Sequence, residues 1–150
     1  SARPGHYLKR NRVSFWNESI AEELDRLWTE PEPEPDGLRL IGRRRRLGHN
    51  SWLQGGRRDG DPDGDAWMHP DDLASRDLRG GQSIELSTDV GRLQVRVQAR
   101  DDVAPGTVVM PHGVHGASLN DLLPSGPDHV ERISGQAVMS GLPVRVRGVD

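Results

Sequence analysis

One run of the chain combines residue types that bind anions. Residues 43–46 are four arginines, and after Leu47 comes the small polar run Gly48-His49-Asn50-Ser51. Arginine side chains and the main-chain N–H groups of a glycine-containing turn are donors that suit phosphates and carboxylates. A charge run of this kind is also typical of a solvated strand edge followed by a loop. Taken alone, the charges favour the solvated edge, and the anion site remains the alternative.

A second polar loop lies between residues 111 and 122. It begins Pro111-His112-Gly113 and ends Ser118-Leu119-Asn120-Asp121-Leu122. Glycine lets a backbone approach a ligand closely. The amide of Asn120 and the carboxylate of Asp121 can pair with the edge of a flat heterocycle through complementary hydrogen bonds. Taken alone, these two residues are better explained as an Asx turn or a helix cap.

Other polar groups predict little chemistry. His112 and His115 have the spacing of ligands on a helix, but their neighbours include glycines, and no cysteine or carboxylate completes a compact set. The acidic run at 59–65 begins like a calcium-binding loop, yet Pro70 stands at the twelfth position, where that loop needs a glutamate. No serine has the surroundings of a hydrolase nucleophile. The sequence therefore predicts no metal site and no self-sufficient active site.

Composition limits the classes to which the chain can belong. Its 150 residues fit one domain, or one domain with an extension, and 18 glycines with 11 prolines favour short strands joined by turns. A net charge of −3 gives no reason to expect a nucleic acid or a membrane as partner. The lack of cysteine excludes disulfides and thiolate ligands within these residues, and is consistent with a cytoplasmic protein. No apolar run approaches the roughly 18 residues of a membrane span.

The N-terminal quarter is predicted to be an arm. Apolar residues recur at helical spacing between Ile20 and Trp28, so we expect a helix over residues 17–28. Asn17 can serve as its N-cap, and Ser19 with Glu22 offers an alternative capping box. The run Pro-Glu-Pro-Glu-Pro-Asp-Gly at 31–37 then predicts a stiff, extended linker. We therefore expect an N-terminal helical arm, residues 1–37, joined to one domain, residues 38–150.

The domain is predicted to be mainly β. Alternating or apolar runs indicate six short strands, one starting at Leu38 and the others at 66–68, 82–88, 92–99, 107–110 and 142–146. A short helix is expected from Pro70 to about Leu78, with little regular structure over 111–141. A closed barrel can bury six short strands and leaves no exposed edge. The loops at 47–65 and 111–141 are long, and long loops usually carry function.

A series of short motifs runs through this domain. They are LIGRR (40–44), NSW (50–52), MHPDD (68–72), LRGGQ (78–82), TDVG (88–91), VAPGTV (103–108), PHG (111–113), NDL (120–122) and SG (134–135). In order and spacing, the series resembles the C-terminal domain of molybdopterin oxidoreductases, the group that includes dimethyl sulfoxide reductase, nitrate reductase and formate dehydrogenase. The resemblance spans residues 38–147. Each motif is weak singly, whereas their common order is specific.

The resemblance implies a six-stranded double-psi β-barrel that closes over one side of a molybdenum (or tungsten) bis-pterin guanine dinucleotide. In the family, the loop after the first strand and the asparagine-containing loop before the last strand contact the pterin and its phosphates. Carried over to this chain, the cofactor-binding residues are Arg45, Gly48, His49, Asn50, Ser51, Trp52, His112, Asn120 and Asp121. Of the four arginines, Arg45 is expected to serve the site, and Arg43 is expected to face solvent.

The resemblance also implies a role. The chain is identified as the cofactor-binding domain of a cytoplasmic molybdopterin-dependent oxidoreductase, with no turnover of its own and with the cofactor absent from the isolated domain. Its expected partners are the upstream catalytic domains of the same enzyme, which hold the metal ligand, and an electron-transfer subunit. The alternative is a free-standing double-psi barrel that acts as a protein or peptide interaction module, with residues 1–37 docking on a partner. Because the chain begins Ser-Ala, we expect either an excised fragment or a protein left by tag cleavage.

Overall fold

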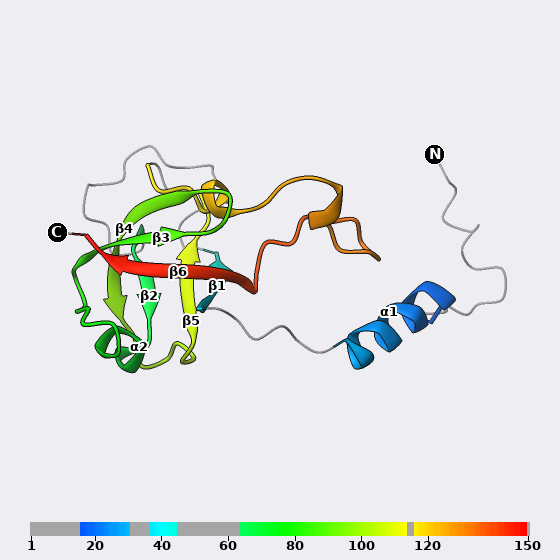
Figure 1. The fold of residues 1–150 in the computed structure, drawn as a ribbon, viewed down its shortest axis with the longest axis horizontal. Helices are drawn as coiled ribbons and strands as arrows, with labels where there is room; N and C mark the ends of the chain where they lie inside the picture. Colours follow the sequence, from blue (N-terminus) through cyan, green and yellow to red (C-terminus); the bar gives the residue numbers. More distant parts are fainter. Residues whose placement is uncertain (1–15, 31–36, 45–63, 114–115, 150) are drawn as a thin grey trace.

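The computed structural model of the protein describes residues 16–30, 37–44, 64–113 and 116–149. Within these ranges the chain forms six strands, two α-helices and two 3₁₀ turns (Figure 1). In chain order they are α1 (Glu18–Thr29), β1 (Leu38–Arg43), β2 (Ala66–Met68), α2 (Pro70–Ala74), β3 (Ser83–Ser87), β4 (Arg92–Ala99), β5 (Thr107–Pro111), η3 (Leu119–Leu122), η4 (Pro127–His129) and β6 (Leu142–Gly148).

The six strands close into a barrel in the order β1-β5-β2-β4-β3-β6. β1 pairs in parallel with β5, from Arg39 opposite Thr107 to Arg43 opposite Pro111, and β2 pairs in parallel with β4. The other four pairs are antiparallel, and β6 completes the circle by pairing with both β1 and β3. Every strand therefore has two neighbours, and the predicted closure without a free edge is confirmed.

The connections make this barrel a double-psi barrel. β1 and β2 follow each other in the chain and run antiparallel, with β5 between them. β4 and β5 also follow each other and run antiparallel, with β2 between them. Two successive antiparallel strands that hold a third between them form a psi motif, and here each motif encloses a strand of the other. The expected fold is thus confirmed by the strand order.

The barrel interior is filled by aliphatic side chains from all six strands. Alternation directs them inward, as in β4, where Leu93 and Val97 are buried and Arg92, Gln94 and Arg96 are exposed. The most deeply buried large side chains are Leu40, Met68, Ile84, Leu86, Met110, Leu119, Leu122, Val97, Val108 and Val144. Two of them, Leu119 and Leu122, come from the turn η3, so this turn closes one end of the barrel.

The predicted elements are found with small differences. The strands at 66–68 and 92–99 have the expected bounds, and β6 runs on to Gly148. α2 begins at Pro70 as expected, with the His69 side chain accepting a hydrogen bond from the Asp71 N–H, but it ends at Ala74 rather than near Leu78. The chain leaves the helix because Asp77 adopts a left-handed backbone (φ 55°). This turn lets the N–H of Leu78 donate to Leu73 O, and the side chain of Leu78 is buried.

The N-terminal helix α1 is also confirmed, and of the two predicted caps Asn17 is the one that the structure shows. The side chain of Asn17 accepts a hydrogen bond from Ile20 N–H at 3.0 Å. No residue of α1 is buried. In the part of the chain that the structure describes, no helix combines the length and the apolar character needed to cross a membrane.

Candidate functional site

The two loops singled out in the sequence start from the same end of the barrel. Because β1 and β5 are parallel and in register at Arg43 and Pro111, both strands finish together. The N–H of His112, the first residue after β5, donates to Arg43 O at 3.1 Å. This end of the barrel, where β1 and β5 finish, is called the β1/β5 end below. The chain leaves it in two directions, through residue 44 and through residue 113.

His112 is seated on strand β1 at a glycine. A Cβ atom placed on Gly42 would lie 2.6 Å from His112 Nε2 and 3.2 Å from a methyl carbon of Leu119. The imidazole therefore packs directly on the backbone of Gly42, in space that only glycine leaves open. His112 keeps partial exposure to solvent. It lies at the β1/β5 end as a half-buried side chain with a fixed position.

The turn η3 presents Asn120 and Asp121 at the same end. Leu119 and Leu122 anchor the turn in the core, whereas Asn120 and Asp121 are exposed. The cap of the turn is Ser118, whose hydroxyl oxygen accepts from Asn120 N–H at 3.3 Å. The interpretation of Asn120-Asp121 as a cap is therefore wrong, because Ser118 already fills that role. Both side chains are left to face outward from the barrel end.

The turn between β3 and β4 holds η3 in place. Thr88 donates its hydroxyl hydrogen to Leu122 O at 2.9 Å. A Cβ atom on Gly91 would lie 2.0 Å from Asp121 O, so the two backbones touch at this glycine. Gly91, like Gly42, is needed for close approach and not for an unusual backbone angle. Each of the two glycines thus lies directly under one of the predicted contact groups.

Arg43 is held by the barrel and does not simply face solvent, which corrects the expectation. Its guanidinium carbon lies 3.6 Å from the centre of the Trp67 ring, and its Nη2 lies 3.4 Å from Asp65 O. A planar cation stacked on an aromatic face is attracted by the ring electrons. Trp67 points outward from β2, where Arg100 also lies over its ring at 4.5 Å. Arg43 therefore provides a positioned positive charge at the β1/β5 end.

Asp65 is the buried acid of this region. Its side chain accepts from Gln98 Nε2 at 2.7 Å and lies 3.5 Å from Arg96 Nη2. A buried carboxylate needs such partners, since an unpaired charge away from water is costly. Asp65 was expected only as part of a calcium-like run, and residues 59–63 of that run lie outside the described residues. Its partners give it a structural role at the start of β2.

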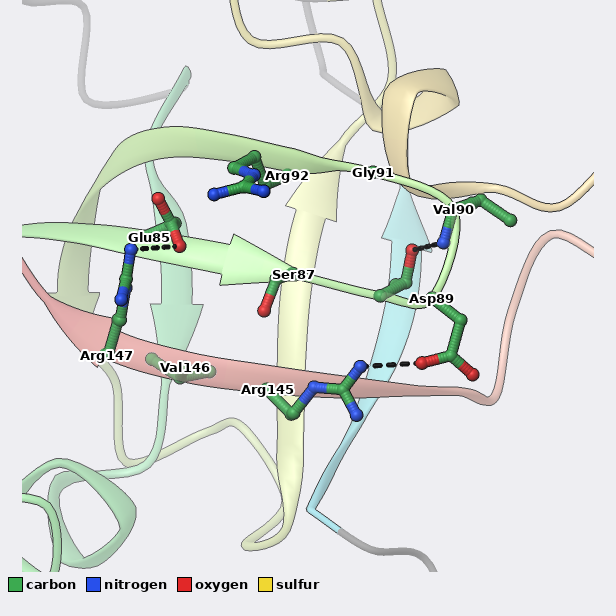
Figure 2. Close-up of a pocket in the computed structure, with 10 residues that line it drawn as sticks. Glu85, Ser87, Asp89, Val90, Gly91, Arg92, Arg145, Val146 and Arg147 are labelled. Atoms are coloured by element: carbon green, nitrogen blue, oxygen red, sulfur yellow. Dashed lines mark hydrogen bonds and ion pairs between the residues drawn. The ribbon is translucent and has the colours of Figure 1, made fainter.

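Beside the β3–β4 turn, the outer wall of the barrel carries a hollow of about 700 Å³ (Figure 2). Three arginines reach into it from β4 and β6: Arg92, Arg145 and Arg147. Arg147 pairs with Glu85 at 2.9 Å, and Arg145 pairs with Asp89 at 2.6 Å. Two of the three charges are therefore balanced by carboxylates on β3 and its turn, which makes this wall mainly a set of cross-strand ion pairs.

The predicted site residues divide into two groups. His112, Asn120 and Asp121 are described, and the structure brings them together at the β1/β5 end. The first-loop residues lie outside the described residues: Arg45, Gly48, His49, Asn50, Ser51 and Trp52. Among the residues with described positions, no three histidine, aspartate or glutamate side chains gather as metal ligands. Sequence reasoning missed the seating glycines, whose only signal was their place inside the motifs LIGRR and TDVG.

Among solved structures, acetylene hydratase from Pelobacter acetylenicus matches with a TM-score of 0.67 and 20% identity, over 97% of this chain and 22% of that chain. At this identity the likeness shows the fold alone, and the chain spans about a fifth of that enzyme's length. A rationally designed protein, mkDPBB_sym_86, matches with a TM-score of 0.45 and 17% identity, over 81% of this chain and 100% of its own. No curated protein matches the chain.

A family comparison gives the assignment. The family described as "Molydopterin dinucleotide binding domain" matches residues 38–139, about two thirds of the chain. The matched range contains five of the six strands, the loop after β1, His112 and η3. The match therefore includes the ends of β1 and β5 and the segments that follow them. This chain belongs to the molybdopterin dinucleotide-binding domain family.

Proposed function

We propose that this chain is the cofactor-binding domain of a molybdenum or tungsten oxidoreductase, and that it binds and encloses a bis-pterin guanine dinucleotide at the β1/β5 end. One observation carries the proposal. Because β1 and β5 pair in parallel and end together, the arginine-rich loop and the His112–Asp121 segment both begin at one end of the barrel. Two segments that are about 70 residues apart in the sequence thus supply one potential binding surface.

The chemistry of the donors fits such a group. The exposed amide of Asn120 and carboxylate of Asp121 offer acceptors and donors that complement the polar edge of a pterin. Arg43, fixed on Trp67, and Arg45 in the following loop supply cations for a pyrophosphate. Main-chain N–H groups of residues 48–52 would add neutral donors to the same phosphates. When bound, the cofactor supplies the metal at which the redox chemistry takes place.

In this proposal the domain holds the organic part of the cofactor and leaves turnover to other parts of the enzyme. The upstream catalytic domains would supply the metal ligand, and an electron-transfer subunit would be a further partner. The length relation to acetylene hydratase supports a domain of a larger enzyme, since the match covers only 22% of that chain. The lack of cysteine in the 150 residues supports a cytoplasmic location.

The test removes one donor from each loop in the full-length enzyme. We expect the double variant Arg45→Ala/Asn120→Ala to lower cofactor occupancy, because a lost charge-assisted hydrogen bond weakens binding about tenfold or more. Metal and pterin per protein molecule are measured after identical purification. The matched control is Arg79→Ala/Asp101→Ala, a pair of exposed residues at the opposite end of the barrel. Full cofactor occupancy in the Arg45→Ala/Asn120→Ala variant would contradict the proposed cofactor-binding role.

A further inference from the structure

The helix α1 displays its apolar face to solvent. This face consists of Ile20, Leu24, Leu27 and Trp28, which recur every three or four residues. Leu24 is 42% exposed, Leu27 57% and Trp28 89%. An amphipathic helix normally buries such a stripe against another element. In the described part of the chain, nothing buries this one.

Local interactions alone leave a helix of this length marginal. α1 has 12 residues, and isolated helices of that size are barely stable in water. Its stabilising contacts are the Asn17 cap and the ion pairs of Arg26 with Glu23 and Glu30. The Arg26 guanidinium holds the pKa of Glu23 below its usual range, but exposed ion pairs of this kind contribute little. The largest gain in stability for this helix would come from a surface that covers its apolar face.

Within the described residues, α1 contacts the segment 130–139 through the polar side of the helix. Glu23 Oε2 lies 3.9 Å from Arg132 Nη1, and Ser19, Glu22 and Glu23 line a small hollow with Arg132 and Ile133. At 100° per residue, these three helix residues lie about 120° or more around the helix axis from Trp28, whereas Glu23 lies only about 40° from Leu27. The segment 130–139 thus contacts the polar side of α1 up to the edge of its apolar face, and leaves Leu24 and Trp28 open.

The segment 130–139 is itself poorly covered. Val130 is 39% exposed, Ile133 54% and Met139 41%, although the segment is closed by a bridge between Val130 and Ala137. These side chains are exposed on the segment that contacts α1, so apolar groups of both segments are uncovered outside the barrel. Exposed apolar groups that gather in one region commonly mark an interaction site.

We propose that the apolar face of α1, with the segment 130–139 beside it, is the surface on which another domain of the same enzyme docks. α1 carries four acidic residues and one arginine, so the docking groove should have an apolar floor and a basic rim. The match to acetylene hydratase covers 97% of this chain but only 22% of that one, which favours the remaining enzyme over a second copy as occupant. The inference rests on the proposed function, because it takes this chain to be part of a larger molybdopterin enzyme.

Photo-crosslinking in the full-length enzyme tests the occupant. A benzophenone amino acid replaces Trp28, whose 89% exposure makes the replacement harmless to the fold of this domain. We expect the crosslinked peptides to come from the enzyme outside these 150 residues. The matched control places the same group at Glu22, on the polar side, where crosslinks should fall near residues 132–133. Crosslinks from position 28 to residues 38–149, to a second copy, or to nothing would overturn the proposal.

Hydrogen exchange gives a second readout on variants. In the full-length enzyme, Trp28→Asp should make the α1 amides exchange about tenfold faster or more, because it puts a charge into the covered face. Glu22→Gln should leave that exchange unchanged, and equal effects of the two substitutions would contradict the docking. Cofactor content is measured on the same preparations. An enzyme without molybdopterin would overturn the proposed function, whereas crosslinks confined to the barrel would overturn only the docking.

Discussion

At the residue scale, two glycines decide where the predicted contact groups lie. Gly42 leaves room for the imidazole of His112, and Gly91 lets the Asp121 carbonyl touch the β3–β4 turn. These two contacts join residues 70 and 30 positions apart in the chain. The residue types at His112 and Asp121 could be singled out from the sequence because they carry chemistry. The need for glycine could not be predicted, because it depends on which atoms of a distant segment arrive opposite.

Alanine at the two glycines should affect the site in different ways. Gly42→Ala displaces a side chain, so we expect lower cofactor occupancy in the full-length enzyme with little loss of stability. Gly91→Ala meets a backbone oxygen at 2.0 Å, so η3 must shift and stability should also fall by about 1–3 kcal/mol. Metal content and the denaturant midpoint report the two effects. Gly80→Ala, which meets Ala99 N at 3.3 Å at the opposite end of the barrel, is the control; equal occupancy in all three variants would contradict the seating role.

At the element scale, the alternation of apolar and polar residues predicted where the strands lie, but not which strands pair with each other. The alternation in residues 92–99 fixes which side chains of β4 point inward, and the structure confirms it. Alternation carries no information on which strands pair, however, so the parallel pairs β1–β5 and β2–β4 were not predicted. α2 ended early because Asp77 took a left-handed backbone without being glycine, which no helix-stop rule for glycine or proline would have found.

The short helix α2 is tied to the barrel by one hydrogen bond that can be tested. Asp72 Oδ2 accepts from the N–H of Gly106, in the turn before β5, at 2.7 Å. Because the acceptor is charged and its side chain is only 14% exposed, Asp72→Ala should lower the free energy of unfolding by about 1.5–3 kcal/mol. Asp71→Ala removes the same first-turn charge from an 87% exposed side chain and serves as the control. Urea unfolding of both variants measures the difference, and equal losses would show that the bond to Gly106 contributes nothing.

At the scale of the whole molecule, closure links all six strands into one unit. β5 lies between β1 and β2 while β2 lies between β4 and β5, so no strand pair can leave without breaking the pairing of its neighbours. This arrangement predicts one cooperative unfolding transition for the barrel. It also separates the barrel from α1, whose residues contribute nothing to the buried core. The closed barrel, and not α1, is thus the part of the chain that forms the β1/β5 end.

The same leucine-to-alanine substitution, made once in the barrel and once in α1, compares how much each part contributes to the stability of the 150-residue chain. Leu40, in the middle of β1, is fully buried, whereas Leu27 on α1 is 57% exposed. Leu40→Ala should lower the free energy of unfolding by about 2–5 kcal/mol in a single transition, because it leaves a cavity in the closed core. Leu27→Ala should change it by less than about 0.5 kcal/mol, as expected for an uncovered surface position. Urea unfolding followed by circular dichroism measures both. If Leu27→Ala costs as much as Leu40→Ala, then α1 packs on its own barrel, and its apolar face is not available to another domain.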